Sequence, residues 1–236
     1  IPLTDDTLKA KKERWQNLAI SDNVNMIISF LGDSITEGVG ATSRENRFSS
    51  VLCRKVGAIE ENYGLSGTRI ARQRVHYGDV PDEDFIIRTR WMNPKADFVF
   101  VFGGTNDFGH GDAPIGQKGD DTPFTFYGAM KQLCDILLEK FGEEKVCFIL
   151  PTPRYSQDFP NNNGVKTWGN FPALEGYREV MRDVLSSYRF DTLELSALPD
   201  RPKQGPSEFY KDGLHPNDKG HEAIADELYR YLQKKG

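Results

Sequence analysis

The stretch NMIISFLGDSITEG, residues 25–38, places a polar turn directly after an apolar segment. Its first half, residues 25–31, has the composition of a buried β-strand. Its second half begins with Gly32, Asp33 and Ser34, which are residue types common in turns. Ser34 therefore has two interpretations: an ordinary turn residue, or a hydroxyl group held at a strand end for chemistry. The rest of the chain decides between them.

Four later segments are also short, β-rich and bounded by turn residues. They are residues 58–63, 97–102, 145–150 and 190–195. The segments 97–102 (DFVFVF) and 145–150 (KVCFIL) are nearly continuous apolar runs. Such runs are typical of strands that are covered on both faces, as in parallel sheets.

Helical patterns follow these segments. Apolar residues recur at helical spacing over residues 124–141 and 172–188, and again in a last helix that begins near Asn217. Strands that alternate with helices predict a parallel sheet with right-handed crossovers and helices on both faces. We therefore expect residues 1–236 to form one α/β domain, a three-layer α/β/α sandwich around a five-stranded parallel sheet, with an extra helix at about 5–18.

Two long irregular segments, residues 108–123 and 154–171, directly follow expected strands. Ligands of such sheets bind at the carboxyl ends of the strands. Loops of this length in a compact domain are usually functional or disordered. We expect both loops at the binding edge of the sheet and leave their roles open.

The composition is that of an ordinary globular protein: 38% of the residues are hydrophobic, 28% are charged, and the net charge is −5. This balance argues against a nucleic-acid partner, which would require clustered Lys and Arg. No apolar run reaches the roughly 18 residues of a membrane span. The three cysteines are too scattered for a disulfide framework or a zinc site. We expect no metal and no cofactor, and the oligomeric state stays open.

The chain begins with Ile1-Pro2 rather than with Met, which leaves a processed or trimmed N-terminus open. We expect a soluble protein and favour the cytoplasm. Secretion is the alternative if a signal peptide was removed.

Two further turns carry groups suited to binding an oxyanion. Residues 63–68 (YGLSGT) follow the second strand and are expected to open a helix. A small residue there, such as Gly67, lets backbone N–H groups point at an anion. Asn106 follows two glycines after the third strand, where its side-chain amide would project from the strand end. Taken alone, each segment is better explained as a simple turn.

Asp212 lies three residues before His215, across a glycine and just before the last helix. A carboxylate at this spacing can accept a hydrogen bond from the imidazole Nδ1–H within a single loop. That bond selects the tautomer and leaves Nε2 free to act as a base. The alternative is a helix-entry turn with a surface histidine.

Together, these four turns resemble the sequence blocks of the SGNH, or GDSL-type, hydrolase family. The blocks correspond to residues 32–34 (GDS), Gly67, Asn106 and residues 212–215 (DGLH), and the similarity extends over about residues 25–235. The resemblance implies a flavodoxin-like fold and a serine esterase that works through an acyl-enzyme.

The resemblance also implies a role for each block residue. Ser34 would be the nucleophile, His215 the general base and then acid, and Asp212 the residue that orients His215. The oxyanion hole would consist of the N–H groups of Ser34 and Gly67 and the side-chain amide of Asn106.

Competing motifs fit less well. The run at residues 38–40 (GVG) begins like a dinucleotide-binding fingerprint but lacks the third glycine. Neither the phosphate-binding P-loop pattern nor the GxSxG pattern of α/β-hydrolases occurs. Asp33 has no second carboxylate or histidine at metal-ligand spacing, so we expect it to act in the turn. His221, on the last helix, is expected to be a surface or packing residue.

The loop 154–171 is rich in aromatic and amide side chains. Rings together with amides suit an acylated sugar, so we expect a short, acetyl-like ester on a polar or carbohydrate alcohol; alternatively, the rings simply anchor the loop to the core. The expected substrate contacts are Asp33, His110, Tyr155 and Trp168. The alternative functions are a lysophospholipase or short-chain lipase, an acyltransferase with the same residues, and a non-catalytic glycan-binding module.

Overall fold

The computed structural model describes residues 26–74, 83–158, 173–199 and 202–235. Five parallel strands form one sheet in the order β2-β1-β3-β4-β5, which is the flavodoxin-like order. The strands are β1 (Ile27–Gly32), β2 (Ile59–Gly64), β3 (Phe98–Phe102), β4 (Val146–Ile149) and β5 (Asp191–Leu193). All five predicted strands are therefore confirmed, with small shifts of their ends.

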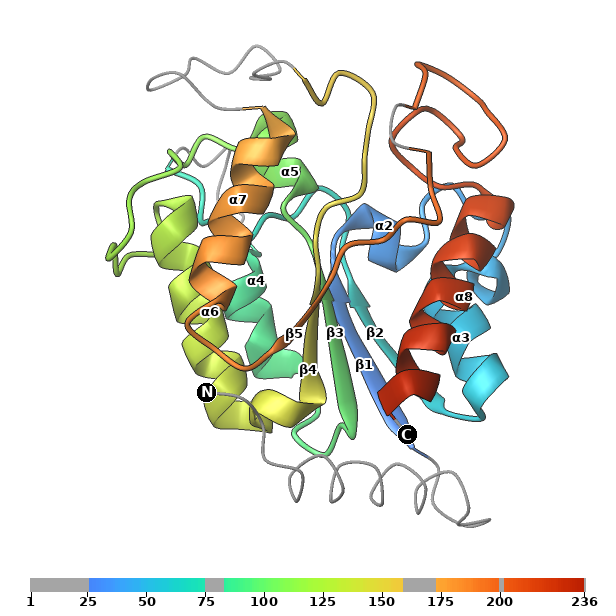
Figure 1. The fold of residues 1–236 in the computed structure, drawn as a ribbon, viewed down its shortest axis with the longest axis horizontal. Helices are drawn as coiled ribbons and strands as arrows, with labels where there is room; N and C mark the ends of the chain where they lie inside the picture. Colours follow the sequence, from blue (N-terminus) through green and yellow to red (C-terminus); the bar gives the residue numbers. More distant parts are fainter. Residues whose placement is uncertain (1–25, 75–82, 159–172, 200–201, 236) are drawn as a thin grey trace.

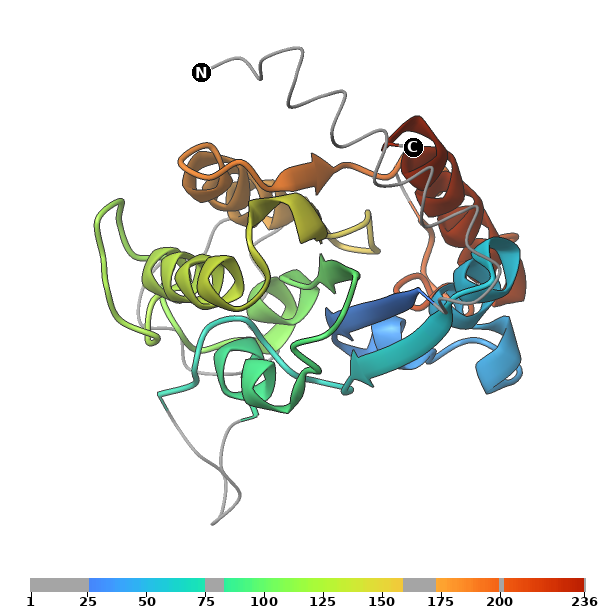
Figure 2. The same cartoon turned by 90° about the horizontal axis from the view of Figure 1, so that it is seen from below.

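Helices cover both faces of the sheet, which confirms the expected three-layer α/β/α sandwich (Figures 1 and 2). One face carries α4 (Phe85–Arg88), α6 (Phe126–Phe141) and α7 (Leu174–Leu185). The other face carries α3 (Phe48–Val56) and α8 (Asp218–Lys235). The short helices α2 (Ser34–Glu37) and α5 (Thr105–His110) lie at the carboxyl ends of the strands. The 3₁₀ segments are η1 (Arg44–Asn46), η2 (Thr89–Trp91) and η3 (Glu143–Lys145).

Alternating side chains of β3 enter two separate hydrophobic cores. Val99 and Val101 pack with residues of α6 and α7 on one face of the sheet. Phe98, Phe100 and Phe102 pack with residues of α3 and α8 on the other face. Because both faces are covered, every position of this strand is buried and the sequence shows a continuous apolar run.

The register of the central strands brings their carboxyl ends to one level. Gly32, at the end of β1, pairs with Gly64 of β2 and with Phe102 of β3. The turns that follow these strands therefore start side by side, at the edge of the sheet where Figure 1 shows α2 and α5. This arrangement makes one site out of segments that are distant along the chain.

The helix expected to open at residues 63–68 is not formed. Residues 65–74 adopt turns and irregular backbone, and the next helix among the described residues, α4, begins at Phe85. The N–H groups of Ile70 and Ala71 donate to the carboxylate of Asp107, at 3.0 and 2.8 Å, rather than to helical carbonyl groups. A buried side chain of α5 thus supplies the acceptors that helical carbonyl groups would otherwise provide.

The segment after β3 also differs from its prediction. Helix α5 covers Thr105–His110, so Asn106 lies in the first turn of a helix and the irregular segment begins only at Gly111. Asn, Asp, Gly and His have low helix propensities, so the sequence carries no helical signal there. The expected helix at about 5–18 and most of the loop 154–171, including Trp168, lie outside the described residues.

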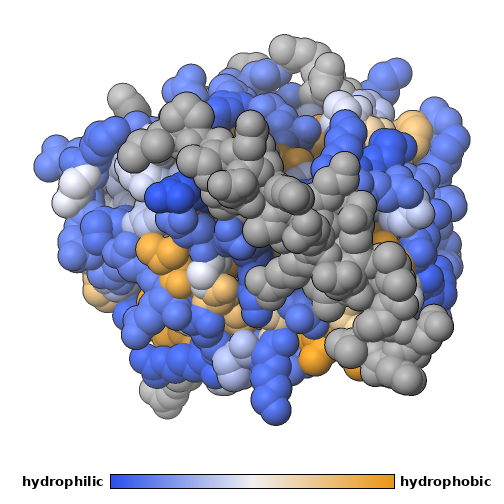
Figure 3. All heavy atoms as spheres, turned by 60° about the horizontal axis from the view of Figure 1, so that its bottom comes forward, coloured by the Kyte–Doolittle hydropathy of each residue, from blue (hydrophilic) through white to orange (hydrophobic). Residues whose placement is uncertain are grey.

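Hydrophilic residues predominate on the face shown in Figure 3, where apolar residues appear in small groups. The large exposed hydrophobic side chains among the described residues belong to different parts of the chain: Ile59, Trp91, Phe124 and Tyr155. In the part of the chain that the structure describes, no helix has the length and apolar character needed to cross a bilayer.

Candidate active site

Ser34 is the first residue of α2 and follows closely on the end of β1. The side chain of Asp33 caps this helix, because its Oδ1 accepts a hydrogen bond from the Ile35 N–H at 3.0 Å. Asp33 and Ser34 are only 2% and 5% exposed. Asp33 thus acts in the turn, as expected, while its contact with substrate stays a prediction.

Two glycines allow α2 to lie directly on the strand ends. A Cβ atom at Gly32 would overlap the hydroxyl of Thr36, and one at Gly64 would overlap the backbone of Glu37. Any larger residue at these two positions would push α2 away from the sheet. The two glycines therefore help to determine how close Ser34, at the start of α2, lies to the carboxyl ends of the strands.

Ser34, His215 and Asp212 form a hydrogen-bonded chain. The Ser34 Oγ lies 3.0 Å from Nε2 of His215, and Nδ1 of His215 lies 2.7 Å from Oδ2 of Asp212. A carboxylate beside Nδ1 favours the tautomer with the proton on that nitrogen, so Nε2 is left to accept the proton of the hydroxyl. The three side chains are thus arranged for removal of a proton from Ser34.

The other oxygen of Asp212 fixes the loop that carries His215. Oδ1 of Asp212 accepts hydrogen bonds from the N–H groups of Leu214 and His215, at 3.0 and 2.8 Å. Partial burial by itself would raise the pKa of Asp212, but the hydrogen bonds from the His215 ring and from these two N–H groups lower the pKa below its ordinary value. Asp212 therefore stays ionised beside the imidazole at neutral pH.

The turn after β2 presents backbone N–H groups near Ser34. Gly67 has φ +76°, and its N–H donates no hydrogen bond to any residue that the structure describes. The preceding residue, Ser66, is held by Glu37 of α2, whose Oε2 accepts from the Ser66 N–H at 2.7 Å and from its Oγ at 2.5 Å. The helix that carries Ser34 thus also positions the turn that carries Gly67.

Asn106, in α5, binds the same turn. Its Nδ2 donates to the carbonyl oxygen of Thr68 at 3.0 Å, and the residue is 4% exposed. A side-chain amide has two N–H donors, so one remains for a second acceptor. As the first residue of α2, Ser34 has no helical acceptor for its own N–H. The donors of Ser34, Gly67 and Asn106 therefore occupy neighbouring turns at this edge.

The similarity to known proteins agrees with this geometry. The sequence model of the GDSL-like lipase/acylhydrolase family matches residues 30–223, a range that contains all of the residues above. The chain belongs to this family. The family assignment and the flavodoxin-like order of the sheet together confirm the resemblance seen in the sequence.

Solved structures share the fold of this GDSL-family protein. A protein from Lactobacillus plantarum is 27% identical, with a TM-score of 0.71 over 90% of this chain and 99% of that chain. A carbohydrate acetylesterase family member from Sinorhizobium meliloti is 19% identical, with a TM-score of 0.60 over 89% of this chain and 98% of that chain. The aryl esterase of M. smegmatis is 16% identical, with a TM-score of 0.63 over 89% of this chain and 100% of that chain. Among curated proteins no match was found.

A buried arginine that no sequence motif indicates, Arg88, contacts the strand ends that carry the GDSL site. Arg88 is 1% exposed, and its guanidinium donates to the carbonyl oxygens of Gly32 and Tyr63 at 2.9 and 2.5 Å. It also donates to Oγ1 of Thr68 at 2.8 Å. Arg88 thus connects the ends of β1 and β2 with the turn that carries Gly67. Its only sequence signal is a charged residue within an apolar run, FIIR, which has several explanations.

Two buried carboxyl groups flank these turns. Burial raises the pKa of Asp33 to about 7, although the Ile35 N–H and the charge of Arg88 oppose the change. Burial likewise raises the pKa of Asp107 to about 6, against the hydrogen bonds from Ile70 and Ala71. Both carboxyls therefore titrate closer to neutrality than an exposed aspartate does.

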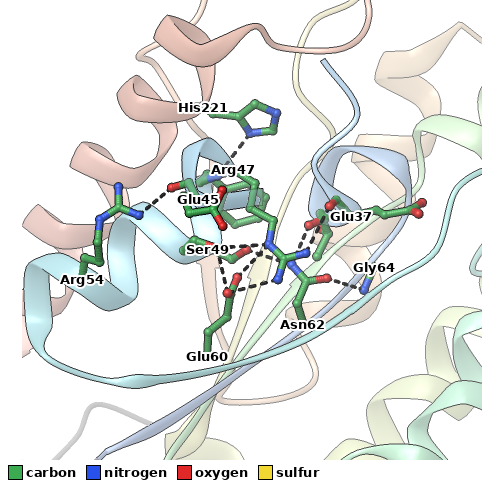
Figure 4. Close-up of polar contacts among 12 residues, drawn as sticks. Glu37, Glu45, Arg47, Ser49, Arg54, Glu60, Asn62, Gly64 and His221 are labelled. Carbon is green, nitrogen blue, oxygen red and sulfur yellow. Dashed lines mark hydrogen bonds and ion pairs between the residues drawn. The ribbon is translucent and has the colours of Figure 1, made fainter. Parts of the chain in front are cut away.

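A polar network behind α2 holds its C-terminal end (Figure 4). Arg47 pairs with Glu60 at 3.0 Å and donates to the carbonyl oxygen of Glu37 at 3.3 Å. Nδ2 of Asn62 donates to the carbonyl oxygen of Thr36 at 2.7 Å. These bonds satisfy carbonyl groups that the end of a helix leaves without partners. They keep the short helix of the GDSL motif in place.

Two other histidines, His110 and His221, lie among the described residues, and their surroundings differ from those of His215. Burial and the charges of Arg69 and Arg154 lower the pKa of His110 to about 4, and its Nδ1 lies 2.8 Å from Nη1 of Arg69. His221 is buried, stacks on Phe48 and accepts from the Phe48 N–H at 3.3 Å, so it is a packing residue. Within the described ranges, no group of three or more His, Cys, Asp or Glu side chains is placed to hold a metal ion.

Tyr155 is the one aromatic residue of the expected substrate loop that the described residues include. Tyr155 is 45% exposed, and its backbone N–H donates to the carbonyl oxygen of Gly213 at 2.8 Å. Gly213 lies between Asp212 and His215. Tyr155 is thus next to the loop of the hydrogen-bonded chain, where a substrate contact stays a prediction.

Proposed function

We propose that this protein is a serine esterase that hydrolyses a carboxylic ester through an acyl-enzyme. The observation that carries the proposal is the continuous hydrogen-bonded chain from Ser34 Oγ through His215 to Asp212, with distances of 3.0 and 2.7 Å. A binding module of the same fold has no need of this chain, and membership of an acylhydrolase family supports the catalytic interpretation.

In the first half of the reaction, Nε2 of His215 takes the proton of Ser34 while Oγ forms a bond to the ester carbonyl carbon. The carbonyl oxygen becomes negatively charged and accepts hydrogen bonds from the N–H groups of Ser34 and Gly67 and the amide of Asn106. Asp212 stabilises the imidazolium. When the bond to the alcohol breaks, His215 gives its proton to the departing oxygen.

In the second half, a water molecule attacks the acyl carbon and His215 takes the proton from that water. The tetrahedral intermediate collapses, the bond to Ser34 breaks, and His215 returns a proton to Oγ. The products are one alcohol and one carboxylic acid. An acyltransferase would differ only in using a second alcohol in place of water.

We propose a short, acetyl-like acyl group on a polar or carbohydrate alcohol as the substrate class. One structure with this fold supports this substrate class by its name, which describes a carbohydrate acetylesterase family member. The scattered exposed hydrophobic side chains of the described residues give no support to a lipid-binding face.

The test is a release assay with 4-nitrophenyl esters of increasing chain length and with acetylated sugars. We expect the rate to be highest for the short esters and Ser34→Ala to reduce release to that of the blank. Product analysis with added alcohols distinguishes hydrolysis from transfer. Undiminished ester hydrolysis by Ser34→Ala would show that the assignment is wrong.

A further inference from the structure

A half-buried arginine, Arg154, lies beside the candidate site and forms no ion pair with a carboxylate of the described residues. It follows β4, and its Nη1 donates to the carbonyl oxygen and hydroxyl of Thr105 at 3.0 and 3.2 Å. The guanidinium lies over the ring of Phe108, 5.4 Å from its centroid. In the part of the chain that the structure describes, Arg154 makes no ion pair, and its buried Nε has no hydrogen-bond partner.

The contacts of this segment place Arg154 within the site. Thr105, which binds its guanidinium, directly precedes Asn106. The next residue after the arginine, Tyr155, binds the carbonyl oxygen of Gly213, between Asp212 and His215. Arg154 therefore lies between Asn106, which would bind the oxyanion, and the loop that carries His215.

Helix α5 leaves space for this guanidinium. A Cβ atom at Gly109 would lie 2.7 Å from Nη1 of Arg154, so any other residue there would force the arginine to move. The ring of Phe108, on the same helix, supports the planar group. Contacts with Thr105, Phe108 and Gly109 thus hold the cation in one place before a substrate arrives.

The energetics of this arrangement favour a negatively charged ligand. Burial removes water from the guanidinium and lowers the pKa of Arg154, and two neutral oxygens and a ring replace the lost hydration only in part. The nearest carboxylates act on it only through space: Asp33, whose pKa is about 7, and Asp212, which is already bound to His215. An anion from outside would supply the missing charged partner.

We propose that Arg154 binds a carboxylate carried by the ester substrate, so that the enzyme prefers anionic esters to neutral ones of the same shape. This inference rests on the proposed esterase function. The carboxylate can belong to the acyl part or to the alcohol part, and the position of Arg154 between the two halves of the site is compatible with each.

Two matched pairs of esters test the proposal. For the alcohol part, the pair is 4-acetoxybenzoate and its methyl ester; for the acyl part, it is mono-4-nitrophenyl adipate and 4-nitrophenyl methyl adipate. We expect the wild type to prefer the charged member of one pair in kcat/KM by about 10-fold or more, since a charge-assisted hydrogen bond contributes about 1.5–3 kcal/mol. The pair that shows the preference identifies the part that carries the charge.

The variant Arg154→Gln should remove most of that preference, and Arg154→Lys should retain part of it. The ratio of the two kcat/KM values is measured within one protein preparation, so losses of folded enzyme cancel. A purely structural role of Arg154 would lower both rates and leave the ratio unchanged, and that result would overturn the proposal. Equal rates for the charged and neutral esters in the wild type would overturn it as well.

The matched control is Arg90→Gln. Arg90 is an exposed arginine of η2, a segment that precedes β3 and hence lies toward the opposite edge of the sheet. The Arg90→Gln substitution removes the same charge as Arg154→Gln. The ratio of kcat/KM for the charged and neutral esters should stay at the wild-type value. The two proposals fail in different ways: if neither the charged nor the neutral esters are hydrolysed, the esterase assignment fails, and if both are hydrolysed at equal rates, the role of Arg154 alone is wrong.

Discussion

At the scale of single residues, Arg88 connects three segments of the site: the end of β1, the end of β2 and the turn that carries Gly67. Its guanidinium binds the carbonyl oxygens at the ends of two strands and the hydroxyl of Thr68. It also lies over the ring of Phe85, 4.7 Å from the centroid. Because Arg88 is only 1% exposed and binds the segments that carry Ser34 and Gly67, we expect it to act as a positioning residue for both.

We predict that Arg88→Met lowers kcat by about 100-fold, because a small displacement of the reacting groups has an effect of that size. It should also lower the free energy of unfolding by about 2–4 kcal/mol, since buried carbonyl groups lose their donor. Urea unfolding and kcat for 4-nitrophenyl acetate measure the two effects, with Arg90→Met as the exposed control. A wild-type kcat in folded Arg88→Met would contradict the positioning role.

The sequence shows a residue's chemistry but not its distant partners. Ser34, Asn106 and the Asp212–His215 pair stand out because each lies in a short turn whose neighbours are visible in the sequence. Arg88 does not, since its partner Thr68 lies 20 residues away and the contact exists only after the strands have paired. The same holds for Asp107, whose carboxylate binds N–H groups 37 and 36 residues away.

At the scale of elements, the long helices and the strands follow from the sequence, and the short helices do not. The helices α6 and α7 contain 16 and 12 residues, enough for an apolar face to recur several times. In contrast, α2 and α5 contain four and six residues, too few for any periodicity. Caps and tertiary contacts determine these short helices, which are the elements that form the site.

The close packing of α2 on the strand ends leads to a prediction at this scale. Gly64→Ala should push α2 off the end of β2 and lower kcat by about 10-fold or more, because a Cβ there would overlap the backbone of Glu37. The control is Gly57→Ala at the end of α3, where φ is +67° and no atom lies within 4 Å of a new Cβ. That control should cost about 1–2 kcal/mol of stability from backbone strain and leave kcat unchanged. Equal kcat values for the two variants would refute the argument.

At the scale of the whole molecule, the packing of the two ends of the domain assembles the site. Ser34 and His215 are 181 residues apart, and their contact depends on α8, which shares a hydrophobic core with α3. The backbone N–H and hydroxyl of Thr42 donate to the carboxylate of Asp218, at 2.7 and 2.6 Å, and so bind the loop after α2 to the start of α8. The sequence predicts α8, whereas no helix is expected at α3, and the contact between the two helices follows only from the order of the strands.

The buried carboxyl of Asp33 connects this assembly with pH. The pKa of an ordinary aspartate is 3.8 and that of Asp33 in the folded protein is about 7, so the folded state binds the proton more tightly. The stability that this proton contributes is fully present below about pH 4 and is lost as the pH rises through about 7. We predict that the free energy of unfolding of the wild type, minus that of Asp33→Asn, falls from pH 4.5 to pH 8. The fall should approach about 4 kcal/mol at most, given about 1.4 kcal/mol per pKa unit.

The asparagine variant is suited to this comparison because Asn also caps helices, so α2 keeps its first hydrogen bond. Asp107, whose pKa is also raised, is present in both proteins, so the difference reports on Asp33 together with its repulsion from the Asp107 charge. Urea unfolding at several pH values gives the free energies directly. A difference that stays constant or grows with pH would mean that Asp33 is ionised throughout, with the charges of Arg88 and Arg154 compensating its burial. In that case a full negative charge would stand beside Ser34 at every pH at which the enzyme works.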